Sequence, residues 1–406
     1  EIEAVTYDVG HARAVYGTFA STLTVFAKEG GDIKALRLAV ERINGALQDV
    51  GFLMREERQS ALEVYLSMIP GHGHRRPRDV FVSARNFADL LPIRTLWQGE
   101  EYSPVLGLPS KSPSLMQGRS STGELFRFNL HHEDAGHTMI FGPTRKGKSV
   151  LLAAMAGNFL KYSNAQVIFF DNGRSMERAS HVFGGSFTHF SGEGGHGVAP
   201  LEHIPTLGDE WAVSWLTQMM RGGNIEITSS VIKEIRACVE SMIDNNHYSL
   251  IAARDYFATQ ELRTMVEKYM ATPVLNTSSG SLDWKQLTVF EMKELFKADE
   301  ATAILVLDYL FAAVGKRLTG QPTLLVLDEA WSFLGHEIFA KRIRDWIKGE
   351  AKANVAVIIA TQSLADVLGS ELEAVLRDNC YTKIFLPNDG ANIEEAAKNY
   401  KALGIN

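Results

Sequence analysis

Residues 139–162 read MIFGPTRKGKSVLLAAMAGNFLKY, and this stretch decides the fold. A short apolar run, typical of a strand, precedes the loop GPTRKGKS, and an Ala- and Leu-rich stretch typical of a helix follows it. In such a P-loop, glycines let the backbone curl so that successive N–H groups point at phosphate oxygens. The helix directs its positive end at the same phosphates. The stretch therefore predicts a nucleotide site between a strand and a helix.

Two side chains of the loop carry the expected chemistry. Lys148 supplies positive charge near the β- and γ-phosphates, and Ser149 offers a hydroxyl to Mg²⁺. Arg145 and Lys146 stand where small residues are commoner, and the sequence leaves open whether they reach phosphate or point outward. The residues predicted to bind the nucleotide are Gly142, Pro143, Thr144, Arg145, Lys146, Gly147, Lys148, Ser149 and Val150.

A second apolar run, TLLVLDEAW at 323–331, ends in two acids. Asp328 is predicted to hold Mg²⁺, and Glu329 to orient and deprotonate the attacking water. Apolar runs that end in solvated acids are common in α/β sheets, so the run alone would decide nothing. Together with the P-loop, it favours nucleotide hydrolysis over transfer to a small acceptor.

A third run, NVAVIIATQS at 354–363, ends in a polar pair. Gln362 is predicted to hydrogen-bond the γ-phosphate or the attacking water. The alternative is that Thr361 and Gln362 only cap the next helix. Asp171, at the end of QVIFFD, lies where parallel sheets bind ligands, and it is either close to the metal site or a turn former.

Short β-branched runs separated by amphipathic stretches predict an α/β fold with a mainly parallel, buried sheet. The expected domains are a smaller α+β domain over 1–102, a linker over 103–123 and a P-loop domain over 124–406, with a helical insertion at about 209–285. Within the first domain, residues 16–27 are expected to form a strand, and 32–50 and 58–69 to form helices.

Composition narrows the function classes. Hydrophobic residues make up 45% of the 406 residues, and the formal net charge is -7, so binding of nucleic acid is not indicated globally. Only two cysteines occur, and His72 and His74 lack acidic or Cys neighbours, so a structural zinc site is not expected. No apolar run is long enough to span a bilayer. The chain has no initiating Met, which suggests a fragment.

The P-loop, the DEAW run and the TQS run together resemble the type IV secretion and conjugative transfer ATPases of the CagE/TrbE/VirB family, within the HerA/FtsK class of ring-forming motors. Further blocks similar to that family are LTVFEMKEL (287–295), TKIFLPN (382–388), YGTFASTLTVFA (16–27) and RNFADLLPI (85–93). The resemblance implies a RecA-like P-loop ATPase domain, preceded by the C-terminal part of the family's amino-terminal α+β domain. It also implies ATP and Mg²⁺ as cofactors, with Lys148, Ser149, Asp328, Glu329 and Gln362 in the roles given above.

The resemblance further implies a self-oligomer, expected to be a hexamer, that works with other secretion components. Its expected location is the cytoplasmic side of the bacterial inner membrane, as a peripheral protein. Related motors place an Arg eleven residues before the sensor Gln, and that position is Ala351 here. Lys352, Arg377 and Lys383 are the candidates for a cation that reaches into the neighbouring subunit, although each also fits a solvated charge.

Three functions stay open at this point. The first is an ATP-hydrolysing motor of a secretion or conjugation machine. The second is a HerA-like DNA translocase, which would share every catalytic residue, so DNA remains a possible partner. The third is an assembly scaffold that uses nucleotide as a structural switch.

Overall fold

The computed structural model describes residues 15–27, 31–49, 51–72, 78–91, 97–105, 107–121, 123–131, 136–190, 196–275, 282–297, 299–329, 337–349, 354–368, 373–388 and 398–401. The chain divides into two compact units, residues 1–96 and 97–406, and each is described by itself. The domain and linker boundaries expected from the sequence stay predictions.

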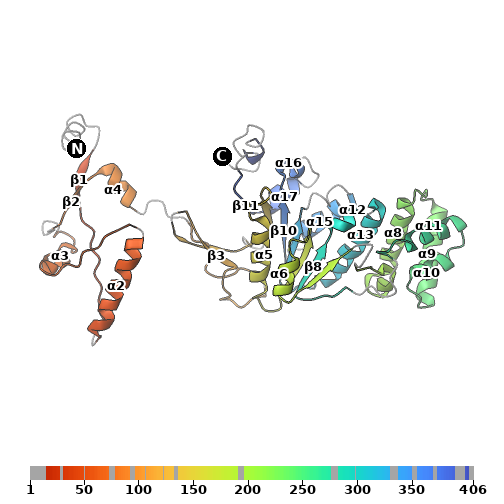
Figure 1. The fold of residues 1–406 in the computed structure, drawn as a ribbon, viewed down its shortest axis with the longest axis horizontal. Helices are drawn as coiled ribbons and strands as arrows, with labels where there is room; N and C mark the ends of the chain where they lie inside the picture. Colours follow the sequence, from red (N-terminus) through yellow and green to blue (C-terminus); the bar gives the residue numbers. More distant parts are fainter. Residues whose placement is uncertain are drawn as a thin grey trace. The chain divides into compact units, whose positions relative to one another are not determined.

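Among the residues that the structure describes, the first unit has a two-stranded antiparallel sheet and three helices (Figure 1). Its elements are β1 (Tyr16–Phe19), α2 (Ile33–Asp49), α3 (Ala61–Ser67), β2 (Val80–Ser83) and α4 (Ala84–Leu90). The helices expected at 32–50 and 58–69 are confirmed as α2 and α3. The strand expected over 16–27 ends at Phe19, because β2 offers only four partners, from Ser83 opposite Tyr16 to Val80 opposite Phe19.

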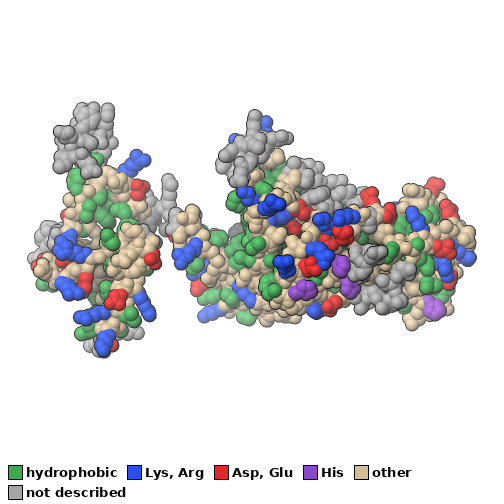
Figure 2. All heavy atoms as spheres, viewed as in Figure 1, with side chains coloured by type: hydrophobic (Ala, Val, Ile, Leu, Met, Phe, Trp, Pro, Cys, Tyr) green, Lys and Arg blue, Asp and Glu red, His purple; other side chains and the backbone are tan. Residues whose placement is uncertain are grey.

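The helices of the first unit have no buried residue among those described. Tyr16 stacks on Phe81 across the two strands, yet the Phe81 side chain is still 62% exposed. Figure 2 shows hydrophobic side chains on the surface of this unit. The unit therefore gains little stability from apolar burial.

The second unit is built on a seven-stranded sheet in the order β11-β5-β10-β9-β6-β8-β7, and every pairing in it is parallel. The strands are β5 (Thr138–Phe141), β6 (Gln166–Asp171), β7 (Ser186–His189), β8 (Leu287–Glu291), β9 (Thr323–Asp328), β10 (Val355–Thr361) and β11 (Thr382–Phe385). A separate antiparallel pair precedes them, β3 (Met116–Arg119) and β4 (Leu125–Phe128). The parallel sheet predicted from the apolar runs is confirmed, and β7 and β8 extend it.

Alternate residues of each central strand enter two different hydrophobic clusters. In β5, Met139 and Phe141 belong to one cluster and Ile140 to the other. Helix α5 (Lys148–Phe159) packs into the cluster of Ile140, and α13 (Glu300–Arg317) packs into the cluster of Met139. The sheet is therefore buried on both faces, which explains why its strands read as unbroken apolar runs.

The helical insertion follows β7 and packs against α13 through α8 (Asp209–Gly222). Its other long helices are α9 (Ser229–Asp244), α10 (Leu250–Tyr256) and α11 (Gln260–Met270), and Figure 1 shows them gathered at one end of the unit. The remaining helices are α6 (Glu177–Val182), η2 (Pro200–His203), α7 (Ile204–Leu207), α12 (Lys293–Lys297), α15 (Glu337–Gly349), α16 (Leu364–Val367) and α17 (Glu373–Asn379). The expected helical character of this insertion is confirmed.

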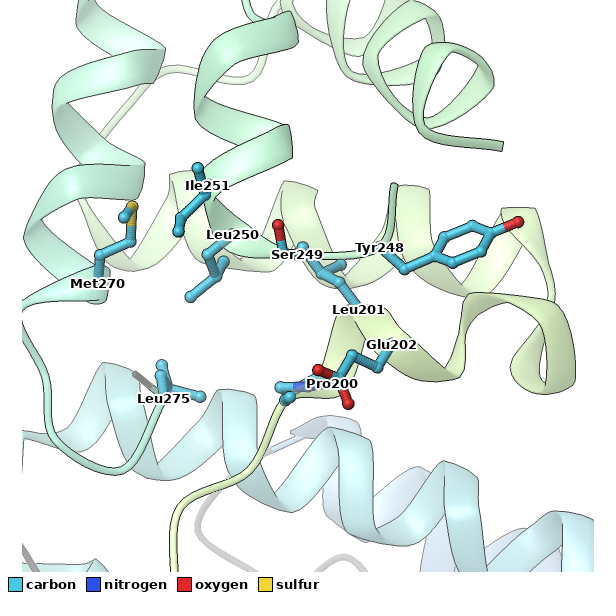
Figure 3. Close-up of a pocket in the computed structure, with 10 residues that line it drawn as sticks. Pro200, Leu201, Glu202, Tyr248, Ser249, Leu250, Ile251, Met270 and Leu275 are labelled. Atoms are coloured by element: carbon cyan, nitrogen blue, oxygen red, sulfur yellow. The ribbon is translucent and has the colours of Figure 1, made fainter. Parts of the chain in front are cut away.

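A pocket of ≈ 280 Å³ lies within the insertion (Figure 3). Leu201 and Glu202 of η2 line one side of it, and Ser249 and Leu250 at the start of α10 line another. Its lining contains none of the residues predicted to bind nucleotide.

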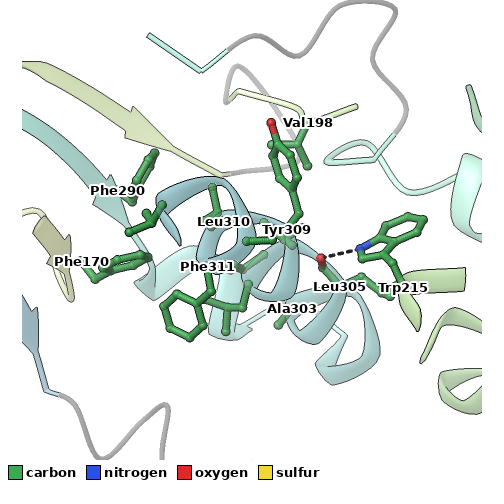
Figure 4. Packing of buried hydrophobic residues seen from close by; sticks show 14 of the residues in the cluster. Phe170, Val198, Trp215, Phe290, Ala303, Leu305, Tyr309, Leu310 and Phe311 are labelled. Atoms are coloured by element: carbon green, nitrogen blue, oxygen red, sulfur yellow. Dashed lines mark hydrogen bonds between the residues drawn. The ribbon is translucent and has the colours of Figure 1, made fainter. Parts of the chain in front are cut away.

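Aromatic side chains fill the space between the sheet and α13 (Figure 4). Phe170 of β6 packs edge-on against Phe311 of α13, with ring centroids 5.1 Å apart. Trp215 of α8 is fully buried and donates its indole N–H to Leu305 O of α13 over 2.9 Å. This hydrogen bond joins the insertion to the helix that covers the sheet.

Candidate nucleotide-binding site

The loop after β5 has the backbone conformation of a phosphate cradle. Arg145 has φ 63 and Gly147 has φ 93, so both are left-handed, and α5 begins directly afterwards at Lys148. Alternation of right- and left-handed residues turns successive N–H groups toward one point, which is how anion-binding nests form. Thr144, Arg145 and Gly147 are exposed, so the loop is open to a ligand. The strand–loop–helix context expected for this motif is therefore confirmed.

Lys148 meets both acids of the DEAW run. Its Nζ lies 3.0 Å from Asp328 Oδ1 and forms a second, shorter ion pair with Glu329 Oε1. All three side chains are buried, at 4–8% exposure. Burial raises the pKa of Asp328 to about 6, and the charge of Lys148 opposes that rise. The sheet thus brings together a cation and two carboxylates separated by about 180 residues in the chain.

Gln362 completes this group from β10. Its Nε2 donates to Glu329 Oε1 over 2.5 Å, so Lys148 and Gln362 hold the same carboxylate oxygen. Glu329 itself has φ 55, an uncommon conformation for a residue with a side chain. Strained backbone of this kind clusters at functional sites, where the surrounding contacts maintain it.

The donor set suits Mg²⁺. Asp328 Oδ1 is buried and accepts no hydrogen bond from the described residues, although Lys148 Nζ is near. A buried carboxylate oxygen of this kind is a ligand for a hard cation, and Ser149 at the start of α5 adds a hydroxyl. Asp328 and Ser149 are therefore the residues that would hold the ion. Among the described residues, no cluster of three or more His, Cys, Asp or Glu side chains forms a separate metal site.

Comparisons with known proteins found relatives in conjugation and type IV secretion systems. The conjugal transfer protein TrbE of Rhizobium radiobacter is 34% identical over 418 aligned residues, which cover 100% of this chain and 50% of the relative. The chain is thus a homologue of the TrbE and VirB4 proteins. The type IV secretion system protein virB4 of Bartonella henselae is 24% identical, over 97% of this chain and 50% of its own length. The chain thus spans about half the length of both relatives.

The solved structure of VirB4 from Thermoanaerobacter pseudethanolicus matches with a TM-score of 0.55 at 16% identity. The match covers 71% of this chain and 88% of the solved one. This likeness concerns the fold, and the expected RecA-like P-loop domain is confirmed. No family model matches the chain.

The sequence also predicts three candidate cations that act on a neighbouring subunit: Lys352, Arg377 and Lys383. Lys352 falls outside the described residues. Arg377 is exposed on α17, 3.7 Å from Glu373, and Lys383 lies on β11 opposite Met139 of β5. Lys383 therefore stands on the flank of the sheet that carries the phosphate loop. Their action on a neighbouring subunit stays a prediction.

Sequence reasoning missed one buried acid, Glu291. It ends β8 beside Asp171, and only 1% of its surface is exposed. Its Oε1 accepts hydrogen bonds from the N–H groups of Gly173 and Lys293. The signal was present, because LTVFE is another apolar run ending in an acid at the same edge of the sheet.

Asp171 acts mainly as a turn former. Its carboxylate accepts hydrogen bonds from Ser175 Oγ at 2.6 Å and from Met176 N at 2.9 Å. Burial raises its pKa, and these hydrogen bonds oppose the rise.

Among the described residues, none of the helices is both long and apolar enough to cross a bilayer.

Proposed function

We propose that this chain binds ATP with Mg²⁺ at the Lys148 group, hydrolyses it as a self-associating motor, and thereby energises a conjugation or type IV secretion apparatus. The observation that carries the proposal is the contact of Glu329 with both Lys148 and Gln362. It joins the phosphate-binding lysine to a buried carboxylate that can act as a base. Similarity to the TrbE and VirB4 proteins supports the biological setting.

The proposed reaction is in-line attack of water on the γ-phosphorus. Glu329 takes a proton from the water while the water oxygen bonds to the γ-phosphorus. The bond from this phosphorus to the bridging oxygen breaks, which releases ADP and leaves inorganic phosphate. Lys148 spreads the negative charge that develops on the phosphoryl group. Gln362 keeps the carboxylate of Glu329 aimed at the water. Mg²⁺, when held by Asp328 and Ser149, neutralises charge on the phosphates.

In the present arrangement, Lys148 is paired with Glu329 instead of phosphate. An entering triphosphate competes for Lys148, and the base is then released to meet water. Binding of nucleotide and formation of the catalytic site would therefore occur together. We place the protein at the cytoplasmic face of the bacterial inner membrane, as a hexamer in contact with other secretion components.

The test is ATP hydrolysis across protein concentration, for the wild type and Glu329→Gln, with sedimentation to follow assembly. A rate per subunit that climbs with oligomerisation, and that is lost in Glu329→Gln, supports the motor. Hydrolysis independent of assembly would contradict the shared site. Strong stimulation by duplex DNA, lost at high salt, would favour a DNA translocase instead.

One observation favours a second function. The ion pair between Lys148 and Glu329 must break when nucleotide binds, so nucleotide could act as a structural switch on an assembly scaffold. Tight nucleotide binding without hydrolysis, in single-turnover measurements on the oligomer, would support this scaffold.

A further inference from the structure

The turn between β6 and α6 contains two left-handed residues and is held by hydrogen bonds to two buried carboxylates. Gly173 and Arg174 are both left-handed, with φ 109 and φ 60. Asp171 holds the turn from one side through Ser175 and Met176, as described above. Glu291 holds it from the other side through Gly173 N over 3.2 Å.

Both of these carboxylates are essentially fully buried, at 0% and 1% exposure. Burial of a carboxylate is costly unless hydrogen bonds compensate for the lost water, and a left-handed residue with a side chain adds strain. In return, the hydrogen bonds of the two carboxylates fix the backbone of residues 172–175. The one long side chain of this segment is that of Arg174, so the turn fixes the starting point of an arginine.

The Arg174 side chain is presented to solvent in a fixed direction. It is 51% exposed and makes two hydrogen bonds to Glu177, from Nε over 3.0 Å and from Nη2 over 2.6 Å. The guanidinium carbon lies 5.9 Å from the ring centroid of Phe187 on β7. Arg174 therefore extends toward β7, the edge strand of the sheet.

This direction takes Arg174 away from the phosphate loop of its own chain. The loop follows β5, and four strands separate β5 from β7. At about 4.8 Å per strand spacing, these two strands lie about 24 Å apart. Both nevertheless end at the same, ligand-binding edge of the sheet.

We propose that Arg174 is a catalytic residue that acts in trans, on the γ-phosphate of ATP bound in the phosphate loop of a neighbouring copy of this chain. The proposal rests on the proposed function. In a head-to-tail assembly, one flank of each subunit meets the opposite flank of the next. The β7 flank of one copy would then cover the exposed phosphate loop of its neighbour.

The chemistry of arginine suits this role. Its planar fork can donate two hydrogen bonds to phosphate oxygens, and a cation inserted beside the γ-phosphate stabilises charge in the transition state. Glu177 holds the guanidinium until phosphate replaces it. Lys383 stands on the other flank, on the strand next to β5 of its own chain. Lys148, Glu329 and Gln362 act in cis, and Arg174 adds a cation from the neighbouring copy.

The phosphate backbone of a nucleic acid is the alternative anion for Arg174, and the mixed charges of the surrounding surface favour it less than ATP. Around Arg174, cations alternate with Glu177 and Glu294, which pairs with Lys297 over 2.8 Å. Figure 2 shows Lys and Arg side chains interspersed with Asp and Glu on this face of the second unit. A backbone-binding groove would instead need a continuous basic stripe.

The test mixes two inactive variants, Lys148→Ala and Arg174→Ala. Alone, Arg174→Ala should bind a fluorescent ATP analogue within about threefold of wild type but hydrolyse ATP at least about a hundredfold more slowly. In an equal mixture, about a quarter of head-to-tail interfaces pair an intact loop with an intact arginine, so activity should return to about that share of wild type. Arg178→Ala, a change of another exposed arginine on α6, is the matched control and should keep full activity.

The outcomes separate the two proposals. An active wild type with no recovery in the mixture overturns the role of Arg174 and leaves the ATPase intact. An inactive wild-type oligomer overturns the proposed function itself. Loss of duplex-DNA binding in Arg174→Ala, with normal hydrolysis, overturns the trans-acting role and assigns the residue to nucleic acid. Because Arg174→Ala alters a surface turn, Arg174→Lys is measured beside it. Lysine lacks the fork, so near-normal hydrolysis by Arg174→Lys would contradict the proposed contact.

Discussion

Lys148 and Glu329 form a buried ion pair, although 181 residues separate them in the chain. One is the proposed phosphate-binding cation and the other the proposed base. Each charge therefore stays paired with the other until the triphosphate of the nucleotide binds Lys148. Because a buried charge without a partner is costly, this pair links nucleotide binding to release of the base.

The first prediction concerns Glu329→Gln. Removal of the charge frees Lys148, so nucleotide should bind up to about tenfold more tightly, which corresponds to about 1.4 kcal/mol. Hydrolysis should fall at least about a hundredfold because the base is lost. Equilibrium binding and single-turnover hydrolysis measure the two effects. The control is Glu240→Gln, an exposed acid on α9. Weaker nucleotide binding by Glu329→Gln would show that the ion pair does not compete with phosphate.

The second prediction concerns Gln362→Ala. Loss of the hydrogen bond to Glu329 should slow hydrolysis by about ten- to hundredfold, the usual worth of a hydrogen bond to a charged group. The dissociation constant for nucleotide should change by less than about twofold, since Gln362 acts through Glu329. A double variant with Glu329→Gln should be no slower than Glu329→Gln alone. Additive losses in that double variant would assign Gln362 a role independent of Glu329.

The third prediction concerns Trp215, which joins the insertion to α13. Trp215→Phe keeps a large ring but loses the hydrogen bond to Leu305 O, so we expect a loss of about 1–2 kcal/mol in the free energy of unfolding. Trp215→Ala should cost about 3–5 kcal/mol because it also leaves a cavity. Urea unfolding measures both.

Trp211 provides the matched control for Trp215. Its indole N–H donates to none of the described residues, and its side chain is only partly buried. Trp211→Phe should therefore cost less than Trp215→Phe. Equal costs would mean that the hydrogen bond to Leu305 contributes nothing measurable.

The fourth prediction concerns the two cysteines. Cys238 and Cys380 are free and buried, and burial raises the pKa of each thiol to about 12. Neither should react with iodoacetamide at pH 8 until urea unfolds the chain. Between pH 9 and 12 the native state holds protons that the unfolded state has lost, so stability should fall as pH rises through this window.

The double variant Cys238→Ala and Cys380→Ala provides the comparison for that pH dependence. It should lose the part of the decline that the thiols cause. An unchanged slope of stability against pH between 9 and 12, relative to the wild type, would contradict the assignment. Rapid labelling of the native protein would show that the thiols are accessible.

Local patterns were sufficient to predict the phosphate loop, the parallel sheet and the residues at the strand ends. A strand that is buried on both faces must be apolar throughout, so its polar ends stand out in the sequence. The same rule applies to LTVFE, which is also buried at every position and also ends in an acid. The strand over 16–27 was predicted too long because β-branched content does not reveal how long its partner strand is.

The sequence by itself determined which side chains stand at strand ends: Lys148 after β5, Asp328 and Glu329 at the end of β9, and Gln362 after β10. Tertiary structure alone decided that β10 lies between β5 and β9, which brings Gln362 and Lys148 to one oxygen of Glu329. It also decided that Arg174 extends toward β7. Strand order and side-chain direction depend on packing between segments far apart in the chain, and no local pattern records that packing.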